Sequence, residues 1–328
     1  MNRRFLLLTA VAGLFGLALA QAPMAGSALA QAKTFKVGVS LPEAQNPFYI
    51  VMGNSISKTL KDAGLEVTLL LSNSSDVNEQ VSQINDLIAA KVDAILVSPQ
   101  NTEGPAPAIQ KAHDAGIPIF MIARTLDPKY KDLWKTYVGF DYYKVGVQKG
   151  KWVVDNLKPG KIAMLLGPAG ALVSVNMAKG FKETVEKAGF TVVWEQNQVQ
   201  TRENGLKFAE DALVANKDLV AIYAMNDDLA LGAAQAVKAG GQKVATLGMN
   251  GAPTALAAVH NGDLSMTILL DPVGWGKQAA LMVADYLTKK QEPSAFVEPF
   301  TPEVVTQANA YDKIPVPLRE KLGVKPRS

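Results

Sequence analysis

The segment Ala221-Ile222-Tyr223-Ala224-Met225-Asn226-Asp227-Asp228, continued by Leu229-Ala230-Leu231-Gly232, indicates the fold most clearly. A short apolar run ends at Asn226, two carboxylates follow, and an Ala- and Leu-rich helical pattern begins. This order predicts a buried strand, a tight turn and a capped helix, with Asp227 or Asp228 accepting hydrogen bonds from the first free N–H groups. Asn226 would lie at the carboxyl edge of a parallel sheet, where open α/β folds bind ligands. The alternative is a turn and cap with no role in binding.

Apolar runs of strand type alternate with helical patterns from Lys33 onward. We expect strands at residues 35–41, 66–71, 94–98, 117–122, 136–140, 161–166, 191–195, 220–224, 244–248 and 265–270. Helical patterns lie between them, for example at residues 81–90, 144–156, 178–188, 205–215, 229–239 and 276–289. Strands separated by helices of about 10 to 15 residues predict βαβ units and parallel sheets. Because the strands are nearly all apolar, we expect helices on both faces of each sheet.

The order of these elements repeats within the chain. Four Ala-Gly pairs each precede a predicted strand, and they match two by two. Ala63-Gly64 corresponds to Ala188-Gly189, and Ala115-Gly116 corresponds to Ala239-Gly240. Both pairs of landmarks are about 125 residues apart, and each glycine is a candidate helix C-cap. Matched landmarks in one order predict two similar α/β halves.

Polar residues end several of the predicted strands. They are Asn46, Ser98 and Arg124 in the first half and Asn226 and Asn250 in the second. If the carboxyl edges of the two sheets face a shared cleft, these amides and one guanidinium would line it. Such a lining suits a small polar ligand.

The N-terminus has the composition of a secretory signal peptide. Asn2-Arg3-Arg4 is followed by an apolar run at residues 5–19 and by the small-residue sites Ala28-Leu29-Ala30 and Ala30-Gln31-Ala32. This pattern predicts a cleaved signal over residues 1–32 and a mature protein in the periplasm. No later segment has 18 consecutive apolar residues, so we expect no membrane span.

Composition excludes several other functions. Without residues 1–32, which hold two of the 33 basic residues and none of the 30 acidic ones, the chain has 31 basic and 30 acidic residues and no basic patch for nucleic acid. There is no Cys, and His113 and His260 are expected at the surface without partners at metal spacing. The glycine-rich run at residues 167–170 lacks the Lys-Ser/Thr of a phosphate loop. We therefore predict a protein that is not an enzyme and has no cofactor or metal.

A series of short motifs then occurs in one order along residues 33–310. They are Val39-Ser40, Asn46-Pro47-Phe48-Tyr49, Leu96-Val97-Ser98-Pro99, Gly116-Ile117-Pro118, Arg124, Val138-Gly139-Phe140-Asp141, the segment 225–232, Gly248-Met249-Asn250-Gly251 and Asp271-Pro272. Each is weak alone, but together, behind a signal peptide, they are specific. Through them the chain resembles the periplasmic sugar-binding proteins of ABC importers, of the ribose-binding type.

The resemblance implies the type I periplasmic binding protein fold, in which two Rossmann-like, doubly wound α/β domains are joined by a three-segment hinge. The hinge would lie near Phe140-Asp141, Leu270-Asp271 and Phe300-Thr301. The first domain would take residues 33–140 and 271–299, and the second residues 141–270 and 300–311. Residues 312–328 would form a tail packed loosely on the outside.

Carried over residue by residue, the family's contacts match only in part. Asn46 and Arg124 match polar contacts, Phe48 and Tyr49 an aromatic wall, and Asn226 an amide of the second domain. At other contact positions this chain differs from the family. Where the family has Asn, Asp, a second Asp and Gln, this chain has Ser98, Ala123, Asn250 and Leu270. Met177, beside Asn176, stands where the family has an Arg, and Gln200 stands at or near its second aromatic wall. The candidate ligand-binding residues are Asn46, Phe48, Tyr49, Ser98, Arg124, Asp141, Asn176, Gln200, Asn226, Asn250 and Leu270.

These replacements remove two carboxylates, each of which would contribute about 1.5–3 kcal/mol through hydrogen bonds to ligand. Ribose is therefore disfavoured. With no carboxylate opposing Arg124, either a less hydroxylated neutral ligand or one with a carboxylate held by Arg124 remains possible. The alternative for Arg124 is a rim residue paired with Asp127 or Asp141. Trp275 is expected either in the core or as an aromatic at the cleft edge.

The resemblance implies a solute-binding protein that captures a small sugar, polyol or sugar acid and delivers it to an ABC importer permease. We expect a monomer whose partners are this ligand and the permease. The alternatives are a periplasmic sensor subunit that presents ligand to a chemoreceptor or histidine kinase, and a binder of a small carboxylate or other non-carbohydrate ligand. A repressor of the related family is not expected, because it would need a helix-turn-helix at the N-terminus, where this chain has the pattern of a signal peptide.

Overall fold

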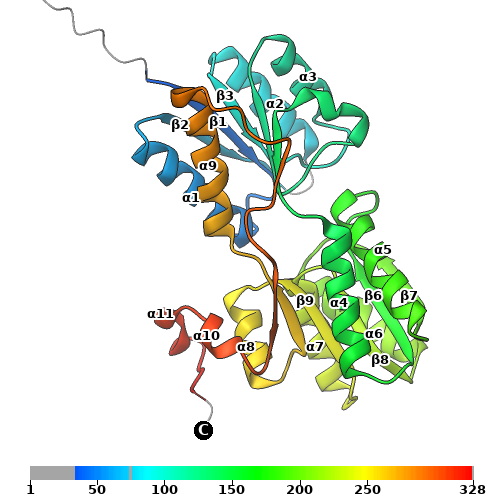
Figure 1. Cartoon of the computed structure of the whole chain (residues 1–328). Coiled ribbons are helices and arrows are strands. Elements are labelled where there is room, and N and C mark those ends of the chain that lie inside the picture. The colour runs from blue at the N-terminus through cyan, green and yellow to red at the C-terminus, as the bar shows by residue number, and fades with distance from the viewer. Residues whose placement is uncertain (1–33, 74–75, 327–328) are drawn as a thin grey trace, which may run out of the picture. The chain divides into compact units, whose positions relative to one another are not determined.

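The computed structural model describes residues 34–73 and 76–326 (Figure 1). The predicted signal peptide, residues 1–32, lies outside the described residues. Within them the chain forms two six-stranded sheets connected by helices. None of the helices in the described part of the chain combines the length and the apolarity of a membrane-spanning helix.

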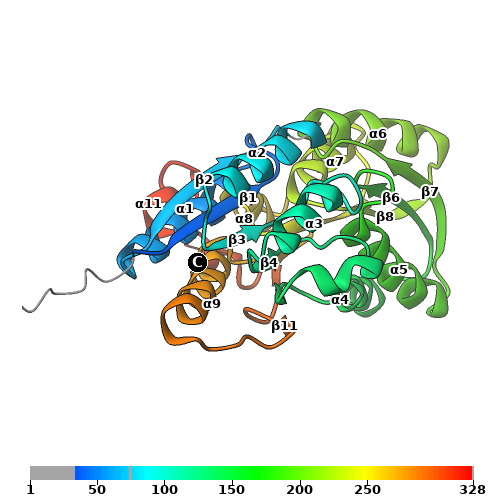
Figure 2. The ribbon, with the colours of Figure 1, turned by 90° about the horizontal axis from the view of Figure 1, so that it is seen from above.

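The first sheet has the strand order β11-β5-β4-β3-β1-β2, and all its paired strands are parallel. Its strands are β1 (Lys36–Leu41), β2 (Glu66–Leu71), β3 (Ala94–Val97), β4 (Ile119–Ile122), β5 (Thr136–Val138) and β11 (Phe296–Val297). The associated helices are α1 (Pro47–Asp62), α2 (Val77–Ala89), α3 (Ala106–Asp114), the 3-10 helix η1 (Pro128–Leu133) and α9 (Pro272–Lys289). A loop from α9 leads to β11 at the edge of this sheet (Figure 2).

The second sheet repeats this arrangement in the order β12-β10-β9-β8-β6-β7. Its strands are β6 (Lys161–Leu166), β7 (Thr191–Asn197), β8 (Leu219–Ala224), β9 (Ala245–Asn250), β10 (Met266–Leu269) and β12 (Glu303–Thr306). Only β12 is antiparallel to its neighbour. The helices are α4 (Tyr142–Asn156), α5 (Leu172–Lys187), α6 (Arg202–Ala215), α7 (Asp227–Ala239), α8 (Pro253–Asn261), α10 (Ala310–Lys313) and α11 (Val316–Arg319).

The predicted fold class is confirmed. Every strand expected from the sequence is present, and the order of the first five strands is the same in both sheets, as the repeated landmarks predicted. The sequence did not predict β11 and β12, which are short and complete the edges of the two sheets. The central strands are buried because helices pack on them, and β3 and β4 are buried along their whole length, whereas the edge strands β2 and β7 are not.

The chain passes between the sheets three times: between β5 and α4, between β10 and α9, and between β11 and β12. An aromatic cluster joins the three crossings. The ring centroid of Phe140, in the first, lies 4.6 Å from that of Trp275, which follows the second, and 4.9 Å from that of Phe300, in the third. Trp275 is fully buried and its Nε1 donates to the Val138 carbonyl at 3.0 Å. Trp275 is therefore a core residue, the first of the two alternatives left by the sequence.

The C-terminal segment packs more closely than predicted. Ile314 and Val324 are buried, and the Nε2 of His260 on α8 forms a 2.8 Å hydrogen bond with the Lys325 carbonyl. The expectation that both histidines lie at the surface is wrong for His260, because this segment covers it.

Helices α4 and α5 approach each other closely at two glycines. A Cβ added to Gly146 would lie 2.0 Å from the Met177 carbonyl oxygen, and one added to Gly180 would lie 2.1 Å from the Tyr143 carbonyl oxygen. Each obstacle is backbone, so a side-chain rotation cannot relieve it. The two helices can therefore pack at this distance only with glycine at these positions.

We predict that Gly146→Ala lowers the free energy of unfolding by about 1–3 kcal/mol or more, because α4 must move away from α5. Gly240→Ala is the matched control, since its φ is −74° and the nearest atom to its added Cβ is 3.4 Å away. Denaturant unfolding of both variants measures the difference. Equal stabilities would show that the helix contact adjusts freely.

Candidate functional site

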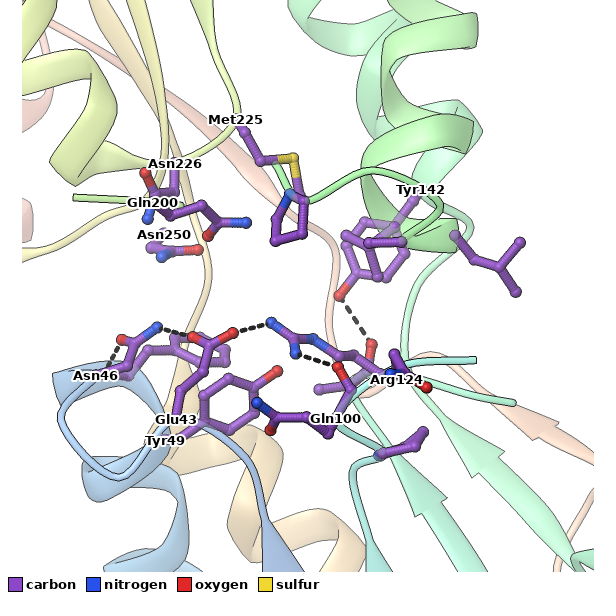
Figure 3. Close-up of a pocket in the computed structure, with 18 of the residues that line it drawn as sticks. Glu43, Asn46, Tyr49, Gln100, Arg124, Tyr142, Gln200, Met225, Asn226 and Asn250 are labelled. Atoms are coloured by element: carbon purple, nitrogen blue, oxygen red, sulfur yellow. Dashed lines mark hydrogen bonds and ion pairs between the residues drawn. The ribbon is translucent and has the colours of Figure 1, made fainter. Parts of the chain in front are cut away.

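A pocket is lined by residues from both sheets and has an empty volume of about 880 Å³, including solvent at its mouth (Figure 3). From the side of the first sheet it is lined by Glu43, Asn46, Phe48, Tyr49, Pro99, Gln100, Asn101, Thr102, Ala123 and Arg124. The remaining lining residues are Tyr142, Pro168, Ala169, Ala171, Leu172, Val173, Gln200, Met225, Asn226, Met249, Asn250 and Leu270. Most lie at or just after the carboxyl ends of parallel strands, where open α/β sheets bind ligands.

Two of the lining asparagines cap helices. The Oδ1 of Asn46 accepts a 3.0 Å hydrogen bond from the backbone N–H of Phe48 at the start of α1. The Oδ1 of Asn226 likewise accepts one of 3.0 Å from Leu229 at the start of α7. With these oxygens occupied, the amide nitrogens remain as donors, and that of Asn46 already gives one hydrogen bond to Glu43.

This arrangement corrects one prediction. The cap of α7 is Asn226 itself, not Asp227 or Asp228. Asp227 is the first helical residue and is buried, where its carboxylate accepts hydrogen bonds from the Ala252 N–H at 2.7 Å and from the Thr267 hydroxyl at 2.6 Å. The charge at the helix start therefore faces the interior of the second half, and the amide faces the pocket.

An ion pair crosses the floor of the pocket between Arg124 and Glu43 (Figure 3). The other Glu43 oxygen accepts a 2.6 Å hydrogen bond from the Nδ2 of Asn46. The guanidinium also lies 5.3 Å from the centre of the Tyr49 ring and donates to the Gln100 carbonyl at 3.4 Å. The expectation that no carboxylate opposes Arg124 is therefore wrong.

The partner of Arg124 is not one that the sequence suggested. The carboxylate of Asp127 caps η1, and that of Asp141 caps α4 by accepting from the backbone N–H groups of Tyr143 and Lys144. The pair with Glu43 was missed because its partners are 81 residues apart. The available signal was a carboxylate two residues after the strand β1 and three residues before Asn46, which was already a candidate.

Both members of this pair are charged at neutral pH. Burial raises the pKa of the Glu43 carboxyl, but Arg124 and the Asn46 amide outweigh burial and lower the pKa below its ordinary value. Burial lowers the pKa of Arg124, but the Glu43 carboxylate outweighs this and raises it. The floor of the pocket is thus polar without net charge.

Aromatic and apolar side chains form the remaining walls. Phe48 and Tyr49 meet edge to face with ring centroids 5.3 Å apart. The hydroxyl of Tyr142 donates to the Ala123 carbonyl at 3.1 Å, which leaves the ring beside the pocket. Met225 and Leu172 add apolar surface from the second half. Polar donors with apolar walls are the usual lining of a small-molecule site.

Eight of the eleven candidate residues line this pocket: Asn46, Phe48, Tyr49, Arg124, Gln200, Asn226, Asn250 and Leu270. The structure does not bring the other three to it. Ser98 is fully buried beyond the end of β3, and Asp141 caps α4. Asn176 is exposed and lies one turn further along α5 than Leu172 and Val173, which line the pocket.

Three of the lining residues have unusual backbone conformations for residues other than glycine. The φ angles are 58° at Glu43, 62° at Ala123 and 123° at Asn250. In the described residues, the other two such residues are Lys91 and Lys290, both at helix ends. Unfavourable backbone conformations concentrate at binding sites because they aim particular groups. Sequence reasoning missed them, because no glycine marks these positions.

A buried lysine lies behind the pocket in the second half. The Nζ of Lys149, on α4, donates to the Ala224 carbonyl at the end of β8 at 2.7 Å and lies 4.0 Å from the centre of the Tyr223 ring. Burial lowers the pKa of Lys149 to about 7, and the nearby charge of Asp227 opposes this. Burial also raises the pKa of Asp227 to about 6. Lys149 thus holds the strand end that leads into Met225 and Asn226.

The fold and the pocket define a class of two-sheet ligand-binding proteins. Residues 37–291 match the model of the periplasmic binding protein domain, and the chain belongs to that family. A ribose import binding protein of Bacillus subtilis is 30% identical over 260 residues, which are 79% of this chain and 84% of the relative.

The solved structures that are similar to this chain include two with a bound ligand of known identity. A periplasmic solute-binding protein of an ABC transporter from Actinobacillus succinogenes, with bound D-allose, is 28% identical with a TM-score of 0.78, covering 85% of this chain and 100% of that one. An ABC transporter solute-binding protein from Bacillus halodurans, with bound myo-inositol, is 26% identical with a TM-score of 0.78, covering 86% of this chain and 98% of that one. In the described residues of this chain, no group of three or more His, Cys, Asp or Glu residues could hold a metal ion.

We predict a pH dependence of stability that Lys149→Met removes. The pKa of Lys149 is about 7 in the folded protein and about 10.4 in an unfolded chain, so the unfolded state binds more protons between these values. The free energy of unfolding should therefore rise with pH from about 7 to 10, by up to about 1.4 kcal/mol per pH unit.

Lys149→Met should flatten this rise, which denaturant unfolding between pH 7 and pH 10 measures. Lys151→Met, an exposed lysine on the same helix, is the control and should keep the slope of the wild type. Parallel profiles for the wild type and Lys149→Met would mean that Lys149 stays protonated throughout this range.

Proposed function

We propose that this chain is the solute-binding protein of an ABC importer and that it captures a small sugar, polyol or sugar-derived ligand in the pocket. The observation that carries the proposal is the pocket itself, which combines amide donors from both halves with aromatic walls and an internally balanced ion pair. The proteins that resemble the chain bind ligands of this kind, as the D-allose and myo-inositol complexes illustrate. A membrane permease would receive the ligand.

The protein groups that would contact the ligand differ from those of the ribose-binding type. At the positions where the ribose-binding type has two Asp and a Gln, this pocket has Ala123, Asn250 and Leu270. The asparagines that cap α1 and α7 offer N–H donors, which pair with hydroxyl oxygens. We propose a neutral ligand with fewer hydroxyl groups and more apolar surface than ribose, such as a short polyol or a deoxy sugar.

We further propose two domains, residues 33–140 with 271–299 and residues 141–270 with 300–311, that close on the ligand. The three crossings between the sheets would be the hinge. Closure requires no chemistry, only a ligand that stabilises the closed state over the open one. The composition of residues 1–32 supports export to the periplasm, where such a protein would meet its ligand before the permease does.

The experiment is a thermal-shift and calorimetric screen of residues 33–328 with D-ribose, D-allose, myo-inositol, erythritol and deoxy sugars. A ligand at 100 times its dissociation constant adds about 2.7 kcal/mol of stability. We predict that Asn226→Asp weakens binding of any such ligand about tenfold or more, because the Nδ2 donors are lost while the carboxylate still caps α7.

Asn176→Asp is the control and should bind as the wild type does, because Asn176 lies outside the pocket. The proposed site is wrong if Asn226→Asp, folded as the wild type, binds with unchanged affinity. The proposed function is wrong if none of the neutral compounds binds to the wild type.

A further inference from the structure

Glu43 and Arg124 decide the charge of the pocket. Among the described residues that line it, Arg124 is the one cation and Glu43 the one anion. The side chain of Arg124 is only 21% exposed and that of Glu43 only 15%. A ligand that enters therefore meets a charge pair already formed by the protein.

The carboxylate of Glu43 is fixed at both oxygens. Oε1 pairs with the guanidinium of Arg124, and Oε2 accepts the 2.6 Å hydrogen bond from Asn46. A carboxylate has about four lone-pair positions, so each oxygen can accept a further hydrogen bond from a ligand hydroxyl. Glu43 can thus contact a neutral ligand without leaving Arg124.

The backbone at Glu43 supports this position. Its φ of 58° is a left-handed conformation that costs a non-glycine residue of the order of 1–2 kcal/mol. The turn is closed by hydrogen bonds from the Asn46 N–H to the Glu43 carbonyl and from the Ala44 N–H to the Ser72 carbonyl, both 2.8 Å. The left-handed residue between strand β1 and helix α1 directs the carboxylate across the floor toward Arg124 (Figure 3).

We propose that Glu43 makes the site selective against anionic ligands, because its carboxylate occupies the place on Arg124 that a ligand carboxylate would take. A carboxylate ligand would have to displace Glu43, which leaves a buried anion unpaired, or lie beside it, which brings two like charges together. A neutral polyhydroxy ligand meets neither obstacle. This inference rests on the proposed function and narrows its ligand class to neutral compounds.

The test compares the wild type with Glu43→Gln by calorimetry. The neutral probes are D-ribose, D-allose and myo-inositol, and the anionic probes are D-ribonate, D-allonate and D-glucuronate. Glu43→Gln keeps the shape of the side chain and a hydrogen-bond acceptor, but it leaves Arg124 without a counter-charge. Glu103→Gln removes an exposed carboxylate of the same half, paired with Lys129, and is the control for net charge.

We expect Glu43→Gln to bind at least one anionic probe about tenfold or more tightly than the wild type does, and Glu103→Gln to show no gain. The double variant Glu43→Gln, Arg124→Gln should lose the gain, which would locate the bound carboxylate at Arg124. Thermal unfolding without ligand confirms that each variant is folded.

The two proposals fail in different ways. Binding of a neutral probe by the wild type, with no gain for anionic probes in folded Glu43→Gln, would overturn the role of Glu43 and leave the proposed function intact. Absence of neutral binding in the wild type, with a gain in Glu43→Gln, would overturn the proposed function and leave the role of Glu43 intact. Tight binding of an anionic probe by the wild type would overturn the selectivity.

Discussion

Helices that follow strands in this protein begin at the edge of a sheet, where their first N–H groups have no partner within the helix. Side chains satisfy these groups at four decisive places: Asn46 before α1, Asp141 before α4, Asn226 before α7 and Asp271 before α9. Asparagine stands at the two caps that line the pocket, and aspartate at the two that follow crossings between the sheets. The same requirement for a cap thus places neutral donors at the pocket and carboxylates at the crossings.

The crossings and the pocket share one aromatic cluster. Phe48 lines the pocket, and its ring centroid lies 5.9 Å from that of Trp275, which in turn packs against Phe140 and Phe300. Aromatic pairs in this range add about 0.5–1.5 kcal/mol beyond the area that they bury. A change in the relative position of the three crossings would have to repack Trp275 and therefore the wall at Phe48. The pocket wall at Phe48 and the three crossings therefore share one packed aromatic cluster.

The sequence predicted the parts of the fold that depend on local pattern. Apolar runs identified each long strand, and polar residues at their ends identified Asn46, Arg124 and Asn226 as neighbours before any contact was known. What it missed depends on contacts between distant segments. Glu43 reaches Arg124 across 81 residues through a left-handed turn, which no local pattern marks. Asn176 lies outside the pocket because only the first residues of α5, such as Leu172 and Val173, reach it.

The Glu43–Arg124 ion pair and the Lys149 cation contrast in how their charges are compensated. Glu43 and Arg124 contact each other directly, so the cost of removing both from water is offset at the pocket floor. Lys149 has a carbonyl and an aromatic face instead, and Asp227 acts on it without a direct ion pair within the described residues. The Lys149 cation is consequently the more costly of the two to bury, and its depressed pKa is the result. Its contact with the Ala224 carbonyl offers a reason to retain it, since that carbonyl ends the strand from which Met225 and Asn226 enter the pocket.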